Sequence, residues 1–334
     1  MKETHGGNQV SRSNRALLIL PAAFAAPVTD NDRKQVLDAV IAHLETEYID
    51  PEVGKRAAKR LREKSVRELL KNAGDGTAVA EALRDKLRAE TGDGHLNVEY
   101  SEKELPSNQE AADAEFSEQE MERYYGAHLN FGVRKAERLE DNIGLLDLAV
   151  FPPSSMGGDT VAAAMQVIAH TDALIIDLRR NGGGMDTVAL VASYLVDSQQ
   201  PLSGIYNRPT GKTTQNFTLP YVPGAKFGGK KPVYVLTSKR TFSAAEALAY
   251  DLQALKRAMI VGEPSGGGAH PFTYRRIHPH FVLWSVVEKS VNPITGKNWQ
   301  GVGVQPDVAV DQAQALEKAL ALIAQKRRQQ RPVK

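Results

Sequence analysis

The chain contains no cysteine, which excludes a thiol nucleophile, a disulfide framework and a cysteine metal site. Apart from a short apolar run near the N-terminus, no apolar run approaches the roughly 20 residues of a membrane span, so stable membrane insertion is not expected. The formal net charge of +2 is too small to indicate a nucleic-acid partner, and basic residues gather only in a tail over 327–334. With 334 residues, 42% of them hydrophobic, the composition is typical of one large or two ordinary soluble domains.

Metal and cofactor binding are not indicated by the motifs either. His270, His278 and His280 form no His-x-x-x-His or mixed histidine and carboxylate pattern that would predict a zinc site. The glycine-rich stretch 180–184 lacks both the Gly-x-Gly-x-x-Gly spacing of dinucleotide-binding proteins and the Gly-Lys-Ser/Thr of a P-loop. We therefore expect no cofactor.

Residues 1–26 have the three parts of a secretory signal. A polar segment with Arg12 and Arg15 precedes a short apolar run over 16–24, and Ala23-Phe24-Ala25 provides an A-x-A-like cleavage site. This pattern favours export to the periplasm or the extracellular space. The alternative is a leader that merely ends in a few apolar residues, since Pro21 interrupts the run.

The rest of the chain divides into three parts. Over 27–100, apolar residues recur at helical spacing, which predicts a small helical N-terminal domain. Residues 101–129 are acidic and polar and are interpreted as a linker. Over 130–326, two alternating strands are followed by strands and helices in turn with short connections, which predicts an α/β core with a largely parallel sheet.

Ser243 lies where the β-branched run 233–236 turns into a helix predicted over 244–258. At such a junction the serine oxygen projects from a tight bend, and unpaired N–H groups at the helix start can hold a negative oxygen. The same residues also read as a capping box, in which Ser243 caps the helix and Glu246 reaches back to its N–H. The local sequence is compatible with both interpretations.

Two further turns are candidate parts of the same site. The glycine-rich turn 180–184 follows a buried strand, so a glycine N–H there and the N–H of Ala244 could hold one oxygen; a simple βα turn is the alternative. His95 follows a helix in the turn Gly92-Asp93-Gly94-His95, where it is either a catalytic base or only a turn residue.

Together these stretches resemble the serine peptidases that include tail-specific (C-terminal processing) proteases and the tricorn core. The resemblance covers roughly 30–315. Within these peptidases, the chain most resembles the branch that is similar to interphotoreceptor retinoid-binding protein. It implies a crotonase-like ββα core beside a small N-terminal helical domain, with too little chain between Tyr100 and Asn142 for a PDZ domain. The motifs that carry it are Gly92–Leu96, Asn130–Leu146, Asp177–Gly184, Thr237–Glu246, Val261–Glu263, Gly266–Pro271 and Asn292–Trp299.

The departures from these families concern the catalytic base. Tail-specific proteases use a Ser/Lys dyad, but the lysine position is Gly268 here. The tricorn pattern instead pairs the serine with a histidine, which His95 matches, and with a glutamate, whose place Gln300 holds. Glutamine can orient a neutral imidazole but supplies no charge to stabilise an imidazolium, and Glu288 is a nearby substitute.

The resemblance implies an exported serine peptidase, an endopeptidase or carboxy-terminal peptidase, that acts on peptides or unfolded proteins. Ser243 would be the nucleophile and His95 the base, with Gly183 and Ala244 as oxyanion-hole donors and Gln300 or Glu288 orienting His95. The rival function is a non-catalytic binder of an apolar small molecule, such as a retinoid or fatty acid, in the same cleft. An ester-cleaving acyl hydrolase is a weaker third possibility, and the oligomeric state is not predicted.

Overall fold

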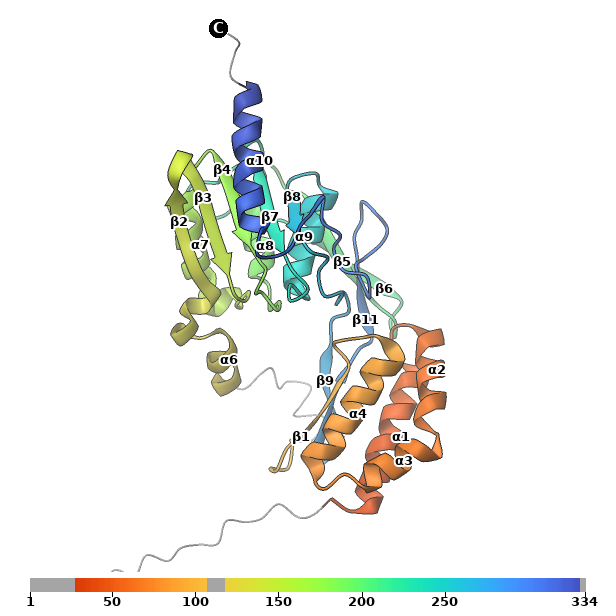
Figure 1. Cartoon of the computed structure of the whole chain (residues 1–334). Helices are drawn as coiled ribbons and strands as arrows, with labels where there is room; N and C mark the ends of the chain where they lie inside the picture. The colour runs from red at the N-terminus through yellow and green to blue at the C-terminus, as the bar shows by residue number, and fades with distance from the viewer. Residues whose placement is uncertain (1–27, 107–117, 331–334) are drawn as a thin grey trace, which may run out of the picture.

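The structure is a computed structural model and describes residues 28–106 and 118–330. It is a mixed α/β fold with helices at the N-terminal end and a mixed sheet in the larger unit (Figure 1). The predicted signal segment, 1–26, lies outside the described residues. Among the described residues, no helix is both long enough and apolar enough to cross a membrane.

The N-terminal unit contains four helices whose ends follow from local sequence. Thr29 caps the first helix together with Asp32, and Asp50 caps the second ahead of a proline at its first turn. Gly92 ends the fourth helix in the left-handed conformation that glycine tolerates. The helices are α1 (Asp30–Thr46), α2 (Pro51–Leu61), α3 (Lys64–Lys71) and α4 (Gly76–Thr91).

A hairpin from the far end of the chain completes this unit. Strand β1 (Asn97–Tyr100) pairs with β10 (Phe281–Ser285), which pairs with β9 (Thr273–His278), both antiparallel. Phe281 and Leu283 are fully buried in the same apolar cluster as the four helices. The N-terminal unit is therefore not made of 27–100 alone, because its helices bury their apolar faces against strands that sequence analysis assigned to the core.

The larger unit is built on a six-stranded sheet in the order β12-β8-β7-β4-β3-β2. The pairing of β2 with β3 is antiparallel and the other pairings are parallel, which confirms the expected strand pair and the largely parallel sheet. The strands are β2 (Val133–Leu139), β3 (Ile143–Leu148), β4 (Ala173–Asp177), β7 (Val233–Thr237), β8 (Met259–Gly262) and β12 (Val308–Ala309).

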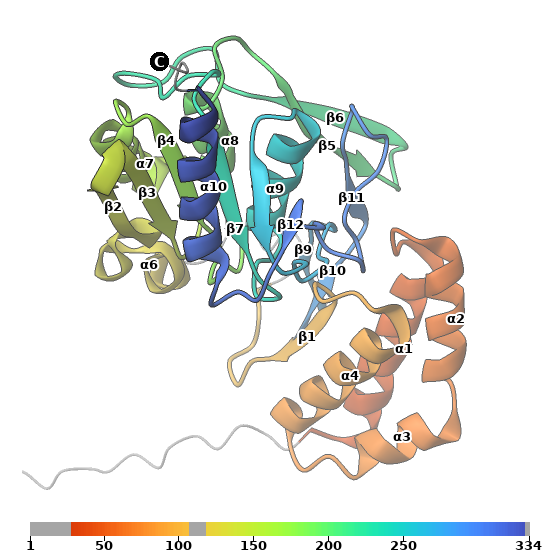
Figure 2. The same ribbon diagram turned by 45° about the horizontal axis from the view of Figure 1, so that its top comes forward.

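Helices cover both faces of this sheet (Figure 2). Alternating side chains such as Leu146 and Ile176 pack against α7 (Ser154–Ile168), α8 (Thr187–Tyr194) and α9 (Ala244–Ala254). The intervening side chains pack against α10 (Ala315–Gln330) on the opposite face. Burial on both faces explains why the central strands read as continuous apolar runs.

The remaining elements connect or extend the two units. A three-stranded sheet in the order β11-β5-β6 extends from the core toward the N-terminal unit (Figure 1). Its strands are β5 (Pro201–Asn207), β6 (Lys212–Phe217) and β11 (Glu288–Val291), and the short helices are α6 (Glu118–Tyr125), η1 (Ala127–Gly132) and η2 (Glu140–Asn142). Part of the predicted linker 101–129 is thus helical, and α10 takes in residues 327–330 of the predicted tail.

The shared core of the N-terminal unit predicts a large effect of Phe281→Ala, although residue 281 is far from the four helices in sequence. We expect the free energy of unfolding to fall by about 3–5 kcal/mol, as for other large-to-small changes in a core. Denaturant unfolding followed by circular dichroism measures this. The matched control is Tyr221→Ala, because Tyr221 is 74% exposed and its loss should cost within about 0.5 kcal/mol. Equal effects of the two changes would contradict the shared core.

Candidate functional site

Ser243 occupies a strained bend between β7 and α9. Its backbone has φ 53° and ψ −120°, a left-handed conformation that a non-glycine residue rarely adopts. The bend is held from outside, because Thr241 Oγ1 donates to Leu178 O at 2.8 Å and Phe242 N donates to Asn181 O at 3.1 Å. Such a bend turns the serine oxygen away from the backbone, and the Ser243 residue is half-buried rather than enclosed.

The buried carboxylate of Glu246 fixes this bend to the loop 265–268. Its Oε2 accepts the N–H of Ser243 and the N–H of Gly268, both at 2.8 Å. Its Oε1 accepts the hydroxyl of Ser265 at 2.5 Å and the N–H of Gly267 at 2.6 Å. Burial raises the pKa of Glu246, and these four donors act against that rise. The capping-box contact expected from the sequence is therefore one part of a larger network.

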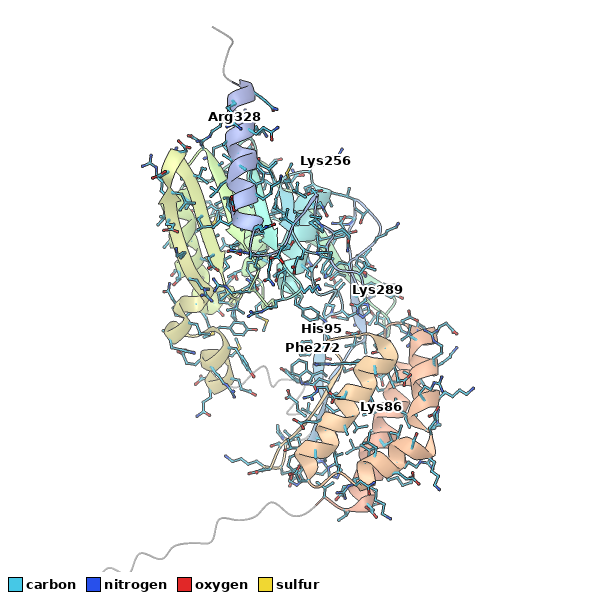
Figure 3. All side chains as sticks on the ribbon, in the orientation of Figure 1. Lys86, His95, Lys256, Phe272, Lys289 and Arg328 are labelled. Atoms are coloured by element: carbon cyan, nitrogen blue, oxygen red, sulfur yellow. The ribbon has the colours of Figure 1, made fainter. Side chains whose placement is uncertain are left out.

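His95 reaches Ser243 from the N-terminal unit. Its Nε2 lies 3.1 Å from Ser243 Oγ, although 148 residues separate the two in sequence. The ring packs at 4.7 Å from the ring of Phe242 and at 5.7 Å from that of Phe272, between the two units (Figure 3). Burial lowers the pKa of His95 to about 4, and the charge of Asp93 only partly opposes this. At neutral pH the imidazole is uncharged and able to accept a proton.

The backbone of Gly183 and Ala244, whose N–H groups were expected to hold an oxyanion, lies beside Ser243. Gly183 has φ 113°, and a Cβ there would lie 2.7 Å from Ser243 Cβ and 3.1 Å from Ala244 N, so only glycine allows this approach. The Ala244 N–H is the first of α9, a position that has no acceptor within the helix. The Gly183 N–H, however, donates to Asn181 Oδ1 at 2.8 Å. Of the two expected donors, the Gly183 N–H is thus already bound to a side chain of the protein.

Neither residue expected to orient His95 does so. His95 Nδ1 is buried and has no hydrogen-bond partner among the described residues. Gln300 Oε1 instead accepts the N–H of Ala269 at 2.8 Å, and Glu288 Oε1 accepts from Asn207 Nδ2 at 2.9 Å. The sequence expectation was wrong here because it assigned roles by position in a motif, whereas both side chains serve the packing of nearby strands and loops.

The structure also explains why Gly268 replaces the lysine of related sites. A Cβ at Gly268 would overlap the ring of Phe242 and lie 2.8 Å from His95 Cε1. A longer side chain at this position would therefore displace the aromatic ring, the histidine or both. The place of a lysine base is taken by a phenylalanine and a histidine.

Sequence analysis missed a buried cluster behind His95. Asp93 Oδ2 accepts from His270 Nδ1 at 2.7 Å and from the hydroxyl of Tyr48 at 3.1 Å. The one available signal was the Gly-Asp-Gly-His turn, which puts a carboxylate two residues before His95. No local pattern could indicate His270, which is 177 residues away. Among the described residues, no group of three or more histidine or acidic side chains is arranged to hold a metal ion.

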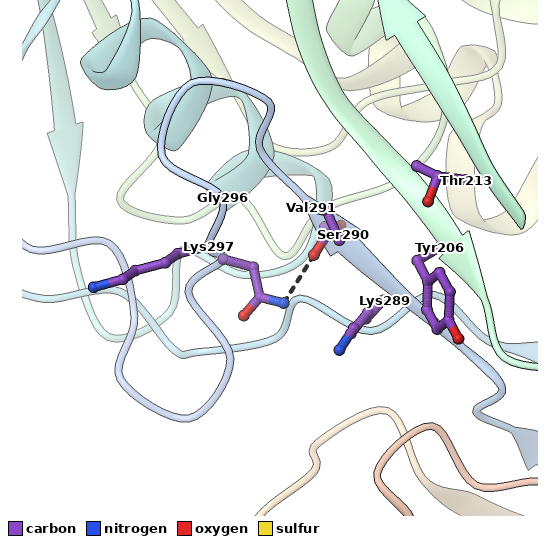
Figure 4. A pocket seen from close by; sticks show the side chains of 8 residues that line it. Tyr206, Thr213, Lys289, Ser290, Val291, Gly296 and Lys297 are labelled. Carbon is purple, nitrogen blue, oxygen red and sulfur yellow. Dashed lines mark hydrogen bonds between the residues drawn. The ribbon is translucent and has the colours of Figure 1, made fainter. Parts of the chain in front are cut away.

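An open pocket of about 700 Å³ is formed by β11, the loop after it and the neighbouring strands β5 and β6 (Figure 4). Lys289 and Lys297 line it, and neither lysine has an ion-pair partner among the described side chains. Its rim is connected to the loop beside His95, because Ser290 N donates to Ala269 O at 2.8 Å. The other lining residues are mostly polar: Tyr206, Thr213, Ser290, Val291, Gly296 and Asn298.

Comparisons with known proteins identify the family of this chain. Residues 142–310, just over half of the chain, match the profile of Peptidase family S41. The chain belongs to this family. The carboxy-terminal-processing protease of Bartonella bacilliformis is 30% identical to this S41 member over an alignment of 184 residues, and the match covers 52% of this chain. The chain spans only 40% of the length of that relative.

Solved structures show the same fold at low sequence identity. A Parabacteroides merdae protein solved as a candidate peptidase matches with a TM-score of 0.62 and 18% identity, over 87% of this chain and 96% of its own. The tricorn protease matches with a TM-score of 0.53 and 12% identity, over 89% of this chain and 37% of its own. Both structural matches extend over most of this chain, well beyond residues 142–310.

The network around Glu246 predicts that Glu246→Gln is strongly destabilising. A glutamine has one acceptor oxygen, so its amide group would face at least one backbone N–H that the carboxylate now satisfies. Each buried donor left without a partner costs about 1–3 kcal/mol, and we expect a loss within or above this range in the free energy of unfolding. Glu317→Gln, on the exposed side of α10, is the matched control and should change it by about 0.5 kcal/mol or less. If the two variants unfold with the same free energy, the Glu246 carboxylate does not hold the bend at Ser243.

Proposed function

We propose that this S41 protein hydrolyses peptide bonds, with Ser243 as nucleophile and His95 as general base. The observation that carries the proposal is the 3.1 Å contact between His95 Nε2 and Ser243 Oγ, made between two units of the fold. A serine used only as a helix cap needs no buried, uncharged imidazole against its hydroxyl. The strained backbone of Ser243 supports the same function, since strain of this kind is common at nucleophile turns.

The reaction follows from the positions of these groups. Ser243 Oγ attacks the carbonyl carbon as its proton passes to His95 Nε2, and the carbonyl electrons move onto the oxygen. The N–H of Ala244 holds that oxyanion, and the N–H of Gly183 joins it once Asn181 releases it. His95 then gives the proton to the leaving amine, and water repeats the sequence to free the acid from Ser243.

The substrate class in this proposal is a peptide or an unfolded protein. It is supported by the family and by the Bartonella relative, which is named as a carboxy-terminal-processing protease. We also propose a crotonase-like ββα core and export directed by residues 1–26. An enzyme that cleaves near carboxy termini and a general endopeptidase both fit this site.

The polar pocket supports a peptide substrate over the rival apolar ligand. A binder of retinoid or fatty acid needs an enclosed cavity lined by apolar side chains. The pocket formed by β11 and the loop after it is open instead, and two lysines and several hydroxyl and amide groups line it, although neither Ser243 nor His95 does. Such a surface suits the polar backbone and charged groups of a peptide.

Ser243→Ala is the first test of the proposed function. We expect hydrolysis of fluorescein-labelled casein, followed by release of fluorescence, to fall to background because the attacking oxygen is removed. The thermal melt of the variant should stay close to that of the unchanged protein, since Glu246 binds the backbone of residue 243 and not its side chain. Hydrolysis at an unchanged rate in the variant would refute the proposal.

The low pKa of His95 predicts the pH dependence of hydrolysis. Because the pKa is about 4 in the folded protein, His95 is uncharged and able to accept a proton at all higher pH values. We expect kcat/KM to be level from about pH 8 down to about pH 5 and to fall as the pH approaches 4. Circular dichroism at each pH separates protonation of His95 from unfolding. A midpoint near the ordinary histidine value of 6.5 would contradict the burial of the His95 ring in the free protein.

A further inference from the structure

One ring nitrogen of His95 has a role in the proposed reaction and the other has no partner. Nε2 contacts Ser243 Oγ, whereas Nδ1 is buried and makes no hydrogen bond to any described residue. For Nε2 to accept a proton, Nδ1 must carry the other ring proton. A buried N–H without an acceptor is costly, and the cost grows when the ring becomes a cation. The reaction therefore needs an acceptor near Nδ1.

The carboxylate of Asp93 lies close to this position. Its Oδ1 is 3.9 Å from His95 Nδ1 and accepts the backbone N–H of His95 at 2.9 Å. Its Oδ2 is held by Tyr48 and His270, so the carboxylate is fixed from both sides and is fully buried. Burial raises the pKa of Asp93, but the hydrogen bond and charge of His270 and the N–H and charge of His95 outweigh it and lower the pKa. Asp93 thus keeps its charge without solvent.

We propose that Asp93, and not Gln300 or Glu288, is the positioning residue of His95. A small tilt of the imidazole brings Nδ1–H onto Asp93 Oδ1, and the carboxylate then stabilises the imidazolium that forms when Ser243 gives its proton to Nε2. Asp93 itself stays unprotonated, and the proton leaves with the amine. Hydrogen bonds at catalytic sites are often long without substrate and shorten in the complex. This inference rests on the proposed function.

His270 gives Asp93 its link to the core. It lies two residues after the loop 265–268, whose N–H groups bind Glu246, and its Nδ1 reaches into the N-terminal unit to contact Asp93. The nucleophile bend and the carboxylate behind the base are thereby connected through one short segment. His270 is a second positioning residue, because it orients Asp93 without contact to Ser243 in any recorded hydrogen bond.

Asp93 also has a structural role that a test must separate. Its contact with the His95 N–H, two residues on, is an Asx turn that stabilises the chain after α4. The charged groups that act on His95 are Asp93, which favours the imidazolium, and His270 and Arg88, which oppose it. Loss of the Asp93 charge in an intact fold should therefore lower the pKa of His95. Loosening of the turn should admit water and raise that pKa toward 6.5.

The experiment uses the full chain and an alkyl fluorophosphonate, which reacts with an activated serine without any peptide. The Ser243 Oγ–P bond forms as the P–F bond breaks, fluoride leaves, and His95 takes the proton. In Asp93→Asn we expect the labelling rate to fall by about 10²–10⁴-fold, because the imidazole loses its orientation and its counter-charge. The pH at which the labelling rate falls to half on acidification should be lower in Asp93→Asn than in the unchanged protein. Glu288→Gln, which alters the residue expected from the sequence, should label at the unchanged rate.

The outcomes separate the two claims. If the unchanged protein does not label at all, the proposed function fails and this inference fails with it. If the unchanged protein labels and Asp93→Asn labels equally fast, or if its acidic limb moves up toward pH 6.5, Asp93 is not the positioning residue and the proposed function stands.

A matched pair at His270 keeps the inference open to refutation if Asp93→Asn does not fold. His270→Asn retains a side-chain N–H that can take the place of Nδ1–H, whereas His270→Ala removes the donor. We expect labelling to be retained in the asparagine variant and to be slower in the alanine variant, with similar thermal melts. Equal labelling rates in the two variants would overturn the role of the Asp93 and His270 pair.

Discussion

The carboxylate of Glu246 is the constraint on which the site depends. It is wholly buried, and it accepts one N–H from the nucleophile bend together with two N–H groups and a hydroxyl from the loop 265–268. A buried charge is tolerated only when its acceptor positions are filled, so the bend and the loop cannot move apart without exposing it. The left-handed backbone of Ser243 is thereby kept in place at a cost of about 1–3 kcal/mol that an isolated turn would not sustain.

The loop that Glu246 fixes also packs against His95, the proposed base. Gly268 presents no side chain toward Phe242 and His95, so both rings fit against the loop that Glu246 fixes. Trp299 is buried, and its Nε1 donates to Gly268 O at 2.9 Å, which holds the loop at a second point. The relative position of serine and histidine thus depends on a loop that supplies neither residue.

Much of the fold and part of the site could be predicted from the sequence. Strands such as 173–177 and the junction at Ser243 follow from local periodicity, since burial on both faces and strand-to-helix turns leave patterns within ten residues. The pairing of His95 with Ser243 came only from resemblance to known motifs. The hairpin 273–285 and the contact of His270 with Asp93 left no local pattern, because they join segments far apart in the chain. The predicted roles of Gln300 and Glu288 were wrong for the same reason, because a position in a motif does not say where a side chain points.

Whether the proposed base is a lysine of the core or His95 of the N-terminal unit determines which contacts must hold the base next to Ser243. A lysine at position 268 would have come from the loop 265–268, in the same unit as Ser243, and its distance to Ser243 would have been fixed by one core. Phe242 fills that space, and the proposed base, His95, comes from the N-terminal unit. The serine and histidine are therefore in contact only while the two units stay packed, and the hairpin β9–β10 ties them by adding strands to β1 and placing Phe281 in the helical core. Burial of His95 between the units lowers its pKa, so the same packing that brings the base to the serine also keeps it uncharged.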